Sequence, residues 1–176
     1  MIGAVLACDI NGGIGKNGTL PWPRISEDLK RFRELTTRAV VVMGRNTWDD
    51  PLLPKPLAQR INVVITNGTI PPYPDTADEV ATANGDMGLI LNQLQDHYRY
   101  QRIFVIGGAS VIQQSLPYID QIYLTKINKE FDCDQHIDYN SIKQEFSRII
   151  QYERSWLLDG TKVEYYQMKR PNATIS

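Results

Sequence analysis

The sequence contains little cysteine, almost no net charge and no long apolar run. Its two cysteines, Cys8 and Cys133, lack the CxxC spacing of zinc sites and belong to no disulfide framework, which indicates a reducing, cytoplasmic setting. A formal net charge of -1 argues against nucleic acid as a partner, because nucleic-acid-binding proteins carry a clustered excess of lysine and arginine. No apolar run approaches the roughly 20 residues that cross a bilayer, and the N-terminus does not resemble a signal peptide. We therefore expect neither a membrane partner nor export.

The composition is typical of a globular protein. Hydrophobic residues make up 42% and charged residues 22% of the 176 positions, close to the averages for globular chains. A chain of this length can bury most of its apolar surface in one core, so we predict one domain over residues 1–176. The Pro-rich tract at 70–74 is predicted to be a surface connection, since strand-forming runs continue on both sides of it. His97 and His136 are predicted to lie on the surface.

Apolar runs of strand length alternate with helical patterns along the chain. Almost uninterrupted apolar runs are typical of strands covered on both faces of a parallel sheet. Amphipathic helical spacing follows Ser26, a candidate N-cap, and recurs over residues 86–98. Asp159 and Gly160, between two strand-like runs, predict a hairpin. We predict an α/β fold: a central, mostly parallel twisted sheet with a C-terminal antiparallel hairpin, flanked by about four helices. The predicted strands include residues 2–8, 40–43, 61–66, 103–106 and 122–127.

Asp28 is a candidate functional acid because its helix places it beside apolar residues. It lies in the first helical turn, where a lone acid usually favours the macrodipole of an exposed helix end. Glu27 points about 100° away and suits that exposed position better. Asp28 is therefore predicted to face inward with Leu29 and Phe32, which form the apolar face of the helix. Trp22, held between two prolines just before the helix, is predicted to roof a pocket or to join the core.

Two strand ends carry glycines and hydrogen-bond donors suited to phosphate. One ends in Gly107 and Gly108 before a helical pattern, and glycine lets a ligand approach backbone amides. It lacks the full GxGxxG spacing, so an ordinary tight turn is an alternative. The other is MGRNTW, in which Arg45 suits a phosphate monoester unless it is a solvated surface arginine. Arg60 could bind a carboxylate in the same way. Ligands gather at the carboxyl ends of strands in open α/β sheets, which favours a phosphate site here, but spacing alone assigns neither arginine.

Five separated segments together resemble dihydrofolate reductases in their order and approximate spacing, and they cover most of the chain. The most specific are LPW followed by an acid-bearing helix, MGRNTW, and IGG. The resemblance implies reduction of 7,8-dihydrofolate to 5,6,7,8-tetrahydrofolate by hydride transfer from NADPH. The five segments are IGAVLACDINGGIG, LPWPRISEDLKRF, VVMGRNTW, IFVIGGASVI, and IYLTKI followed by FDCDQHID.

The resemblance implies a pterin site around Asp28. This carboxylate would hydrogen-bond the pterin N3 and 2-amino group with Thr125 as its partner, and a water near Trp22 would deliver the proton to N5. Leu20 would belong to a mobile loop that closes over the nicotinamide. Arg60 would bind the α-carboxylate of the glutamate tail. The residues implied to contact the substrate are Val5, Asp28, Leu29, Phe32, Leu57, Arg60, Ile106 and Thr125.

The resemblance also implies a cofactor site along the glycine-ended strands. The backbones of Ala7 and Ile14 would contact the nicotinamide carboxamide. Arg45, with Thr66 and Asn67 after the next strand, would meet the 2′-phosphate, which favours NADPH over NADH. The residues implied to contact NADPH are Ala7, Ile14, Gly15, Gly44, Arg45, Asn46, Thr47, Thr66, Asn67, Gly107, Gly108, Ala109, Ser110, Val111 and Ile112.

Two positions depart from the bacterial pattern of the family. Ile112 stands where many bacterial members have a tyrosine near the nicotinamide, and Ser110 replaces a common arginine. We expect both changes to remove a cofactor contact. Asp134 lies in a loop that is expected to pack against the mobile loop, residues 9–24. There Asp134 is expected to hold the mobile loop closed by backbone hydrogen bonds.

Two rival functions remain open at this point. One is a related reductase acting on another pyrimidine or pterin, such as the reductase of riboflavin synthesis, which the pair Trp22 and Asp28 argues against. The other is a non-catalytic structural or nucleotide-binding member of the fold, which Ile112 and Ser110 favour. For the reductase, the expected partners are dihydrofolate and antifolate inhibitors such as methotrexate. We expect a monomer without a bound metal.

Overall fold

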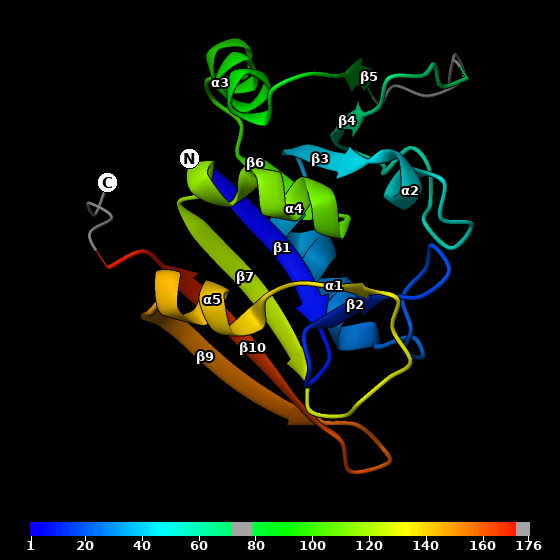
Figure 1. Cartoon of the computed structure of the whole chain (residues 1–176), viewed down its shortest axis with the longest axis vertical. Helices are drawn as coiled ribbons and strands as arrows, with labels where there is room; N and C mark the ends of the chain where they lie inside the picture. Colours follow the sequence, from blue (N-terminus) through cyan, green and yellow to red (C-terminus); the bar gives the residue numbers. More distant parts are fainter. Residues whose placement is uncertain (72–78, 172–176) are drawn as a thin grey trace.

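The structure, a computed structural model, describes residues 1–71 and 79–171, so residues 72–74 of the Pro-rich tract lie outside the described residues. Eight strands form one sheet in the order β5-β4-β3-β6-β1-β7-β10-β9 (Figure 1). Neighbours from β5 to β7 are parallel, whereas β10 is antiparallel to β7 and to β9. Strands β2 and β8 form a second, two-stranded sheet. The strands are β1 (Ile2–Cys8), β2 (Gly13–Gly15), β3 (Val40–Gly44), β4 (Ile61–Ile65), β5 (Val80–Ala83), β6 (Ile103–Gly107), β7 (Gln121–Ile127), β8 (Gln135–His136), β9 (Arg148–Trp156) and β10 (Lys162–Lys169).

Helices cover both faces of the sheet. In Figure 1, α4 and α5 lie in front of the sheet and α1 lies behind it. The apolar side chains of α3, α4 and α5 join one core cluster, and those of α1 and α2 join the clusters on the opposite face. The predicted mostly parallel α/β fold is therefore confirmed. The helices are α1 (Ser26–Thr36), α2 (Arg45–Trp48), α3 (Met87–His97), α4 (Ala109–Ser115), the 3₁₀ turn η1 (Leu116–Tyr118) and α5 (Tyr139–Glu145).

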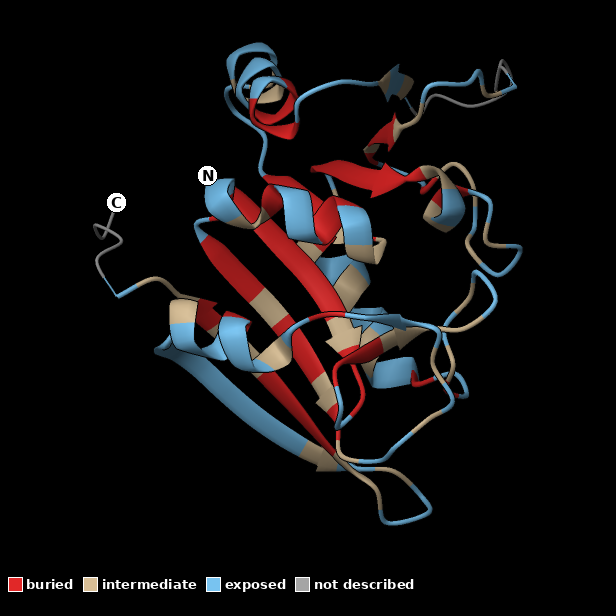
Figure 2. Cartoon of the chain, viewed as in Figure 1, coloured by how far each residue is buried: buried red, intermediate tan, exposed pale blue. Residues whose placement is uncertain are grey.

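Alternation along the central strands explains why both faces are apolar. In β1, the side chains of Leu6 and Cys8 join the core under α4 and α5, whereas Val5 joins the cluster on the α1 face. Successive strand residues point to opposite faces, so a strand buried on both sides must be apolar at every position. The central strands are therefore apolar without interruption in the sequence because both of their faces are buried (Figure 2).

The C-terminal hairpin forms where it was predicted. Asp159 and Gly160 lie in the loop between β9 and β10, and Gly160 adopts a φ of +84°, which glycine tolerates without a steric cost. The loop is closed by hydrogen bonds between Leu157 and Thr161 and between Gly160 and Leu157, each 2.9 Å. His97 and His136 are exposed, as predicted.

Helix α1 begins one residue earlier than its sequence suggests. Ile25 occupies the N-cap position and Ser26 is the first helical residue, so the prediction of Ser26 as the cap was wrong. Ile25 is 7% exposed and packs with Trp22, and this burial decides the register of the helix start over the capping preference of serine. None of the described helices is both long and apolar enough to cross a membrane.

Candidate active site

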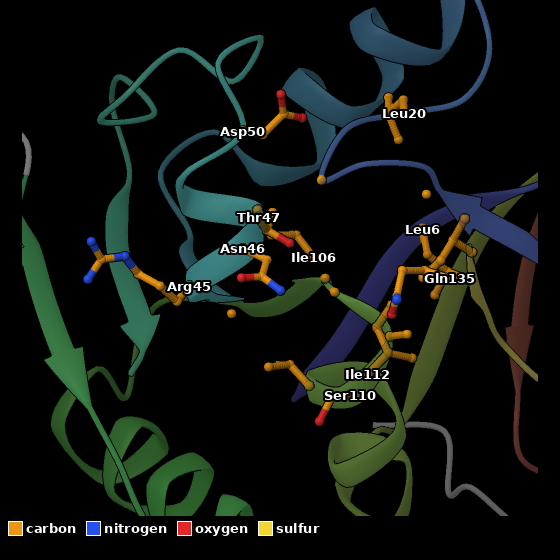
Figure 3. Close-up of a pocket in the computed structure, with 18 of the residues that line it drawn as sticks. Leu6, Leu20, Arg45, Asn46, Thr47, Asp50, Ile106, Ser110, Ile112 and Gln135 are labelled. Carbon is orange, nitrogen blue, oxygen red and sulfur yellow. The ribbon is translucent and has the colours of Figure 1, made fainter. Parts of the chain in front are cut away.

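An elongated cleft of about 490 Å³ runs along the carboxyl ends of β1, β3 and β6. Figure 3 places Arg45 at one end of it and Leu6, Ile112 and Gln135 at the other, with Leu20 and Asp50 above. Because these strands are parallel, their carboxyl ends meet at one edge of the sheet, where ligands of such folds bind. The cleft is thus formed by the topology of the fold.

Most of the residues predicted to bind a dinucleotide line this cleft. Of the described residues in that prediction, only Thr66 and Asn67 lie outside the lining, although Ile65 beside them belongs to it. Glycine is needed where the walls approach each other. A Cβ on Gly44 would lie 3.1 Å from Cγ2 of Val111, and Gly107 has a φ of +140°. The end of β3 therefore packs tightly against α4, and the end of β6 packs against α2, where a Cβ on Gly107 would lie 3.2 Å from Oγ1 of Thr47.

The positive charge of the cleft lining is carried by one residue. Among the described residues that line it, Arg45 is the only lysine or arginine, whereas Asp50 and Asp134 are acidic. The Arg45 Nε donates to Oδ2 of Asp49 at 2.8 Å. The phosphates of a dinucleotide in this cleft could contact one guanidinium and the backbone N–H groups of the glycine-ended strands.

Asp28 meets Thr125 across the α1 face of the sheet. The Thr125 hydroxyl donates to Oδ1 of Asp28 at 2.6 Å, and Thr125 is 5% exposed. Thr125 lies opposite Ala7 in the β1–β7 register, and Ala7 lines the cleft. Burial raises the pKa of Asp28, opposed by the hydrogen bond from Thr125 and by the charge of Arg31. The predicted pair is therefore formed beside the cleft and is partly shielded from water.

Apolar residues predicted to contact the substrate gather next to this pair. Val5, Phe32 and Ile106 share one cluster, and Phe32 and Ile106 also pack in the cluster that contains Leu57. Ile106 lines the cleft as well, so it joins the two regions. Leu29 is 37% exposed. The structure thus brings the other four residues together, as expected for the wall of a ring-binding pocket. Leu29 was predicted to face inward with Phe32, but it is exposed and belongs to none of the described core clusters.

Arg60 lies beside the same apolar cluster but is already engaged. It is 8% exposed, its Nε donates to the Thr36 hydroxyl at 2.9 Å and its Nη1 donates to the carbonyl oxygen of Ala58 at 3.1 Å. Its guanidinium lies 5.8 Å from the centre of the Phe32 ring. These contacts hold the Arg60 side chain next to Phe32, which is predicted to line the substrate pocket.

Trp22 is a core residue next to the candidate site. It is 6% exposed, its ring lies 5.8 Å from that of Phe131 in an edge-to-face arrangement, and it packs with Ala7 and Ile25. The structure therefore places Trp22 in the core, as one of its two predictions had it, and Trp22 is not among the described residues that line the cleft, although its neighbour Ala7 is.

The loop of residues 9–24 is held against the segment 131–137. Strand β2 pairs with β8, the Asn17 N–H donates to Oδ2 of Asp134 at 2.9 Å, and the Asp134 N–H donates to the carbonyl oxygen of Gly15 at 2.9 Å. The predicted backbone hydrogen bonds to Asp134 are therefore present. Leu20, at the end of this loop, is 45% exposed and lines the cleft.

Asp9 is a key residue that the sequence analysis missed. It is 1% exposed, its Oδ1 accepts from the N–H groups of Asn11 and Gly13 at 2.8 Å, and its Oδ2 accepts from that of Phe131 at 3.0 Å. An aspartate followed by Ile-Asn-Gly-Gly signals a turn in which the side chain binds the backbone two residues on. That signal could have identified Asp9 as the anchor of the loop.

Replacing Asp9 should loosen both segments. Asp9→Ala leaves three backbone N–H groups without their acceptor, which costs on the order of 1–3 kcal/mol. We expect faster amide hydrogen exchange in residues 9–24 and 131–137, measured by mass spectrometry, and a lower midpoint in urea. Asp132→Ala is the control, because its ion pair with Lys16 is exposed and contributes little. Unchanged exchange in Asp9→Ala would refute the anchoring role.

The buried carboxylate of Asp28 should lower the free energy of unfolding of the protein at neutral pH. Its pKa is raised from the ordinary value of 3.8, mainly by burial. Between the unfolded and folded pKa the folded state binds more protons, so the free energy of unfolding falls as pH rises through this window. We expect Asp28→Asn to be more stable than wild type by about 1 kcal/mol near pH 7, with a smaller gain toward acid pH. Urea unfolding at both pH values measures this, and a less stable variant at neutral pH contradicts it.

Several cleft residues carry no recognisable sequence signal. Side chains such as Gln114 and Gln135 reach the cleft only because α4 and β8 are placed there by the fold. Asp50 could have been suspected, since only Asp49 separates it from MGRNTW. The lining residues that were not predicted as cofactor contacts are Leu6, Gly18, Thr19, Leu20, Asp50, Ile65, Ile106, Gln114, Asp134 and Gln135.

Comparisons with known proteins agree with this geometry. A family model described as dihydrofolate reductase matches residues 1–168. A dihydrofolate reductase of Schistosoma mansoni is 35% identical over 156 residues, covering 81% of this chain and 82% of that protein. Dihydrofolate reductase type 9 of Escherichia coli is 34% identical over 140 residues, 79% of this chain and 77% of that protein. A dihydrofolate reductase from Enterococcus faecalis, complexed with NADP(H) and RAB-propyl, superposes with a TM-score of 0.74 at 28% identity, covering 98% of this chain and 97% of that chain.

Proposed function

Since the chain belongs to the dihydrofolate reductase family, we propose that it reduces 7,8-dihydrofolate to 5,6,7,8-tetrahydrofolate with NADPH. The observation that carries this proposal is the Asp28–Thr125 pair, at 2.6 Å, beside a cleft that ends in Arg45. A partly buried carboxylate suits the paired donors of an aminopyrimidine edge, and the cleft suits an elongated dinucleotide.

The residues of the cleft fit NADPH. The glycine-ended strands leave space for a pyrophosphate beside backbone amides, and Arg45 supplies the cation for the 2′-phosphate. NADPH, when bound, supplies the hydride that passes from its C4 to C6 of the pterin. The chain itself places the two rings next to each other and covers them with the loop that carries Leu20.

Asp28 binds the pterin and stabilises its protonated form. An ionised carboxylate in a partly buried site interacts more strongly with developing positive charge than it would in water. The Thr125 hydroxyl fixes the orientation of the carboxylate. A proton reaches N5 through a water next to Trp22, because the carboxylate serves the opposite edge of the ring. In this proposal the apolar residues Val5, Phe32, Leu57 and Ile106 surround the pterin and benzoyl rings, and Arg60 binds the tail carboxylate.

An absorbance assay tests this function. Mixing the protein with NADPH and dihydrofolate should lower the absorbance at the wavelength specific to NADPH, and methotrexate should stop the loss by occupying the pterin site. Binding of NADPH without turnover would favour the non-catalytic reading. Turnover of another pyrimidine or pterin, but not of dihydrofolate, would favour the related reductase.

A further inference from the structure

Arg45 is engaged by the chain itself. Its Nε donates to Oδ2 of Asp49, one helical turn further on, at 2.8 Å, and its Nη1 donates to the carbonyl oxygen of Thr69 at 2.9 Å. In Figure 3 the Arg45 side chain points away from Asn46 and Thr47. The single lysine or arginine among the described residues of the cleft lining is thus paired with a carboxylate of the same chain.

We propose that Asp49 is a specificity-determining residue that weakens binding of the phosphorylated cofactor by competing with its 2′-phosphate for Arg45. This inference rests on the proposed function, in which Arg45 meets that phosphate. A phosphate that approaches the guanidinium must either displace the Asp49 carboxylate or accept its repulsion. Both outcomes make binding less favourable than it would be beside an uncharged partner of the same shape.

The geometry also sets the size of the effect. The side chains of Arg45 and Asp49 are 38% and 53% exposed, so water and salt screen their interaction. The competition is therefore modest. It acts on a cofactor with a 2′-phosphate and leaves one without it almost unaffected, which lowers the discrimination between NADPH and NADH. Weaker retention of the phosphorylated cofactor also favours its release after turnover.

Asp49→Asn separates charge from shape. Asparagine keeps the length of the side chain and an oxygen that can accept from Arg45 Nε, but removes the competing charge. Titration by quenching of tryptophan fluorescence should show that the Kd for NADPH falls about two- to five-fold, while the Kd for NADH changes by less than about 1.5-fold. In about 1 M KCl the gain for NADPH should nearly disappear.

A matched control removes another acid from the same kind of pair. Glu34 forms an i,i+4 ion pair with Lys30 on the exposed side of α1, at 3.9 Å. Glu34→Gln changes the net charge as Asp49→Asn does, so it isolates the effect of position. We expect both cofactor affinities to stay at the wild-type value in this control.

A double variant tests whether the effect passes through Arg45. In an Arg45→Gln background, adding Asp49→Asn should leave the Kd for NADPH unchanged. The inference is overturned if Asp49→Asn alone fails to tighten NADPH, tightens NADH equally, or acts as strongly without Arg45. It is overturned together with the proposed function if the wild-type protein neither binds NADPH nor reduces dihydrofolate. Normal wild-type turnover with an unaltered Asp49→Asn variant overturns this inference alone.

Discussion

Asp28→Asn should lower the turnover of dihydrofolate by about 10²-fold or more at neutral pH, because it removes the charge that stabilises the protonated pterin. The carboxylate receives a hydrogen bond from Thr125 and lies beside the apolar cluster of Phe32, so water compensates poorly for its loss. The Kd for NADPH should stay within about twofold of wild type, since the variant leaves the cleft lining intact. Steady-state rates and a cofactor titration on the same preparation measure both quantities.

The neighbouring acid provides the control for this variant. Glu27 lies on the same helical turn and is exposed, so Glu27→Gln makes the same chemical change outside the site. It should turn over like wild type. Turnover of Asp28→Asn equal to that of Glu27→Gln would exclude Asp28 from the reaction. Urea unfolding of the same preparation separates a loss of activity from a loss of folding, because we expect Asp28→Asn to be at least as stable as wild type near pH 7.

Arg45→Gln should raise the Kd for NADPH by about ten- to a hundred-fold, because a charge-assisted hydrogen bond to a phosphate is lost from a cleft with one described cation. The Kd for NADH should change by less than about threefold, since that cofactor lacks the 2′-phosphate. At saturating NADPH the turnover should remain near wild type, because the contact is the same in the ground state and the transition state.

The control for Arg45 is an arginine far from the cleft. Arg148 is exposed on β9, at the edge of the sheet remote from β3, so Arg148→Gln changes net charge equally without touching the cofactor. If Arg45→Gln raised the Kd for NADPH and the Kd for NADH equally, Arg45 would support the structure of the cleft without contacting the 2′-phosphate.

The strands were predictable because their burial is a property of contiguous residues. The run at 40–43 is apolar at every position, and β3 is buried at every position. The start of α1 was predicted less well, since the burial of Ile25 depends on Trp22 and on β10, which the local sequence does not specify. Local sequence patterns thus predicted which segments form strands and helices, whereas the residues at which these elements begin and end depend on tertiary packing.

The residues of the candidate site were likewise predictable only where they belong to one contiguous motif. The glycines at the ends of β3 and β6 were visible as motifs in the sequence. The contact between Asp28 and Thr125, in contrast, joins residues 97 positions apart and was predicted from the family resemblance alone. Asp9 also needs Phe131 from a distant segment to satisfy its second oxygen. The Arg45–Asp49 pair could have been inferred from i,i+4 spacing, because such residues are neighbours on a helix.

A crystal structure of the protein with folate and NADP⁺ tests the central claim most directly. We predict that the Asp28 carboxylate lies within hydrogen-bonding distance of N3 and the 2-amino group of the pterin. The dinucleotide should extend from Ile112 to Arg45 along the glycine-ended strands. A pterin bound elsewhere, or an Asp28 carboxylate that touches only Thr125 and solvent, would contradict the account.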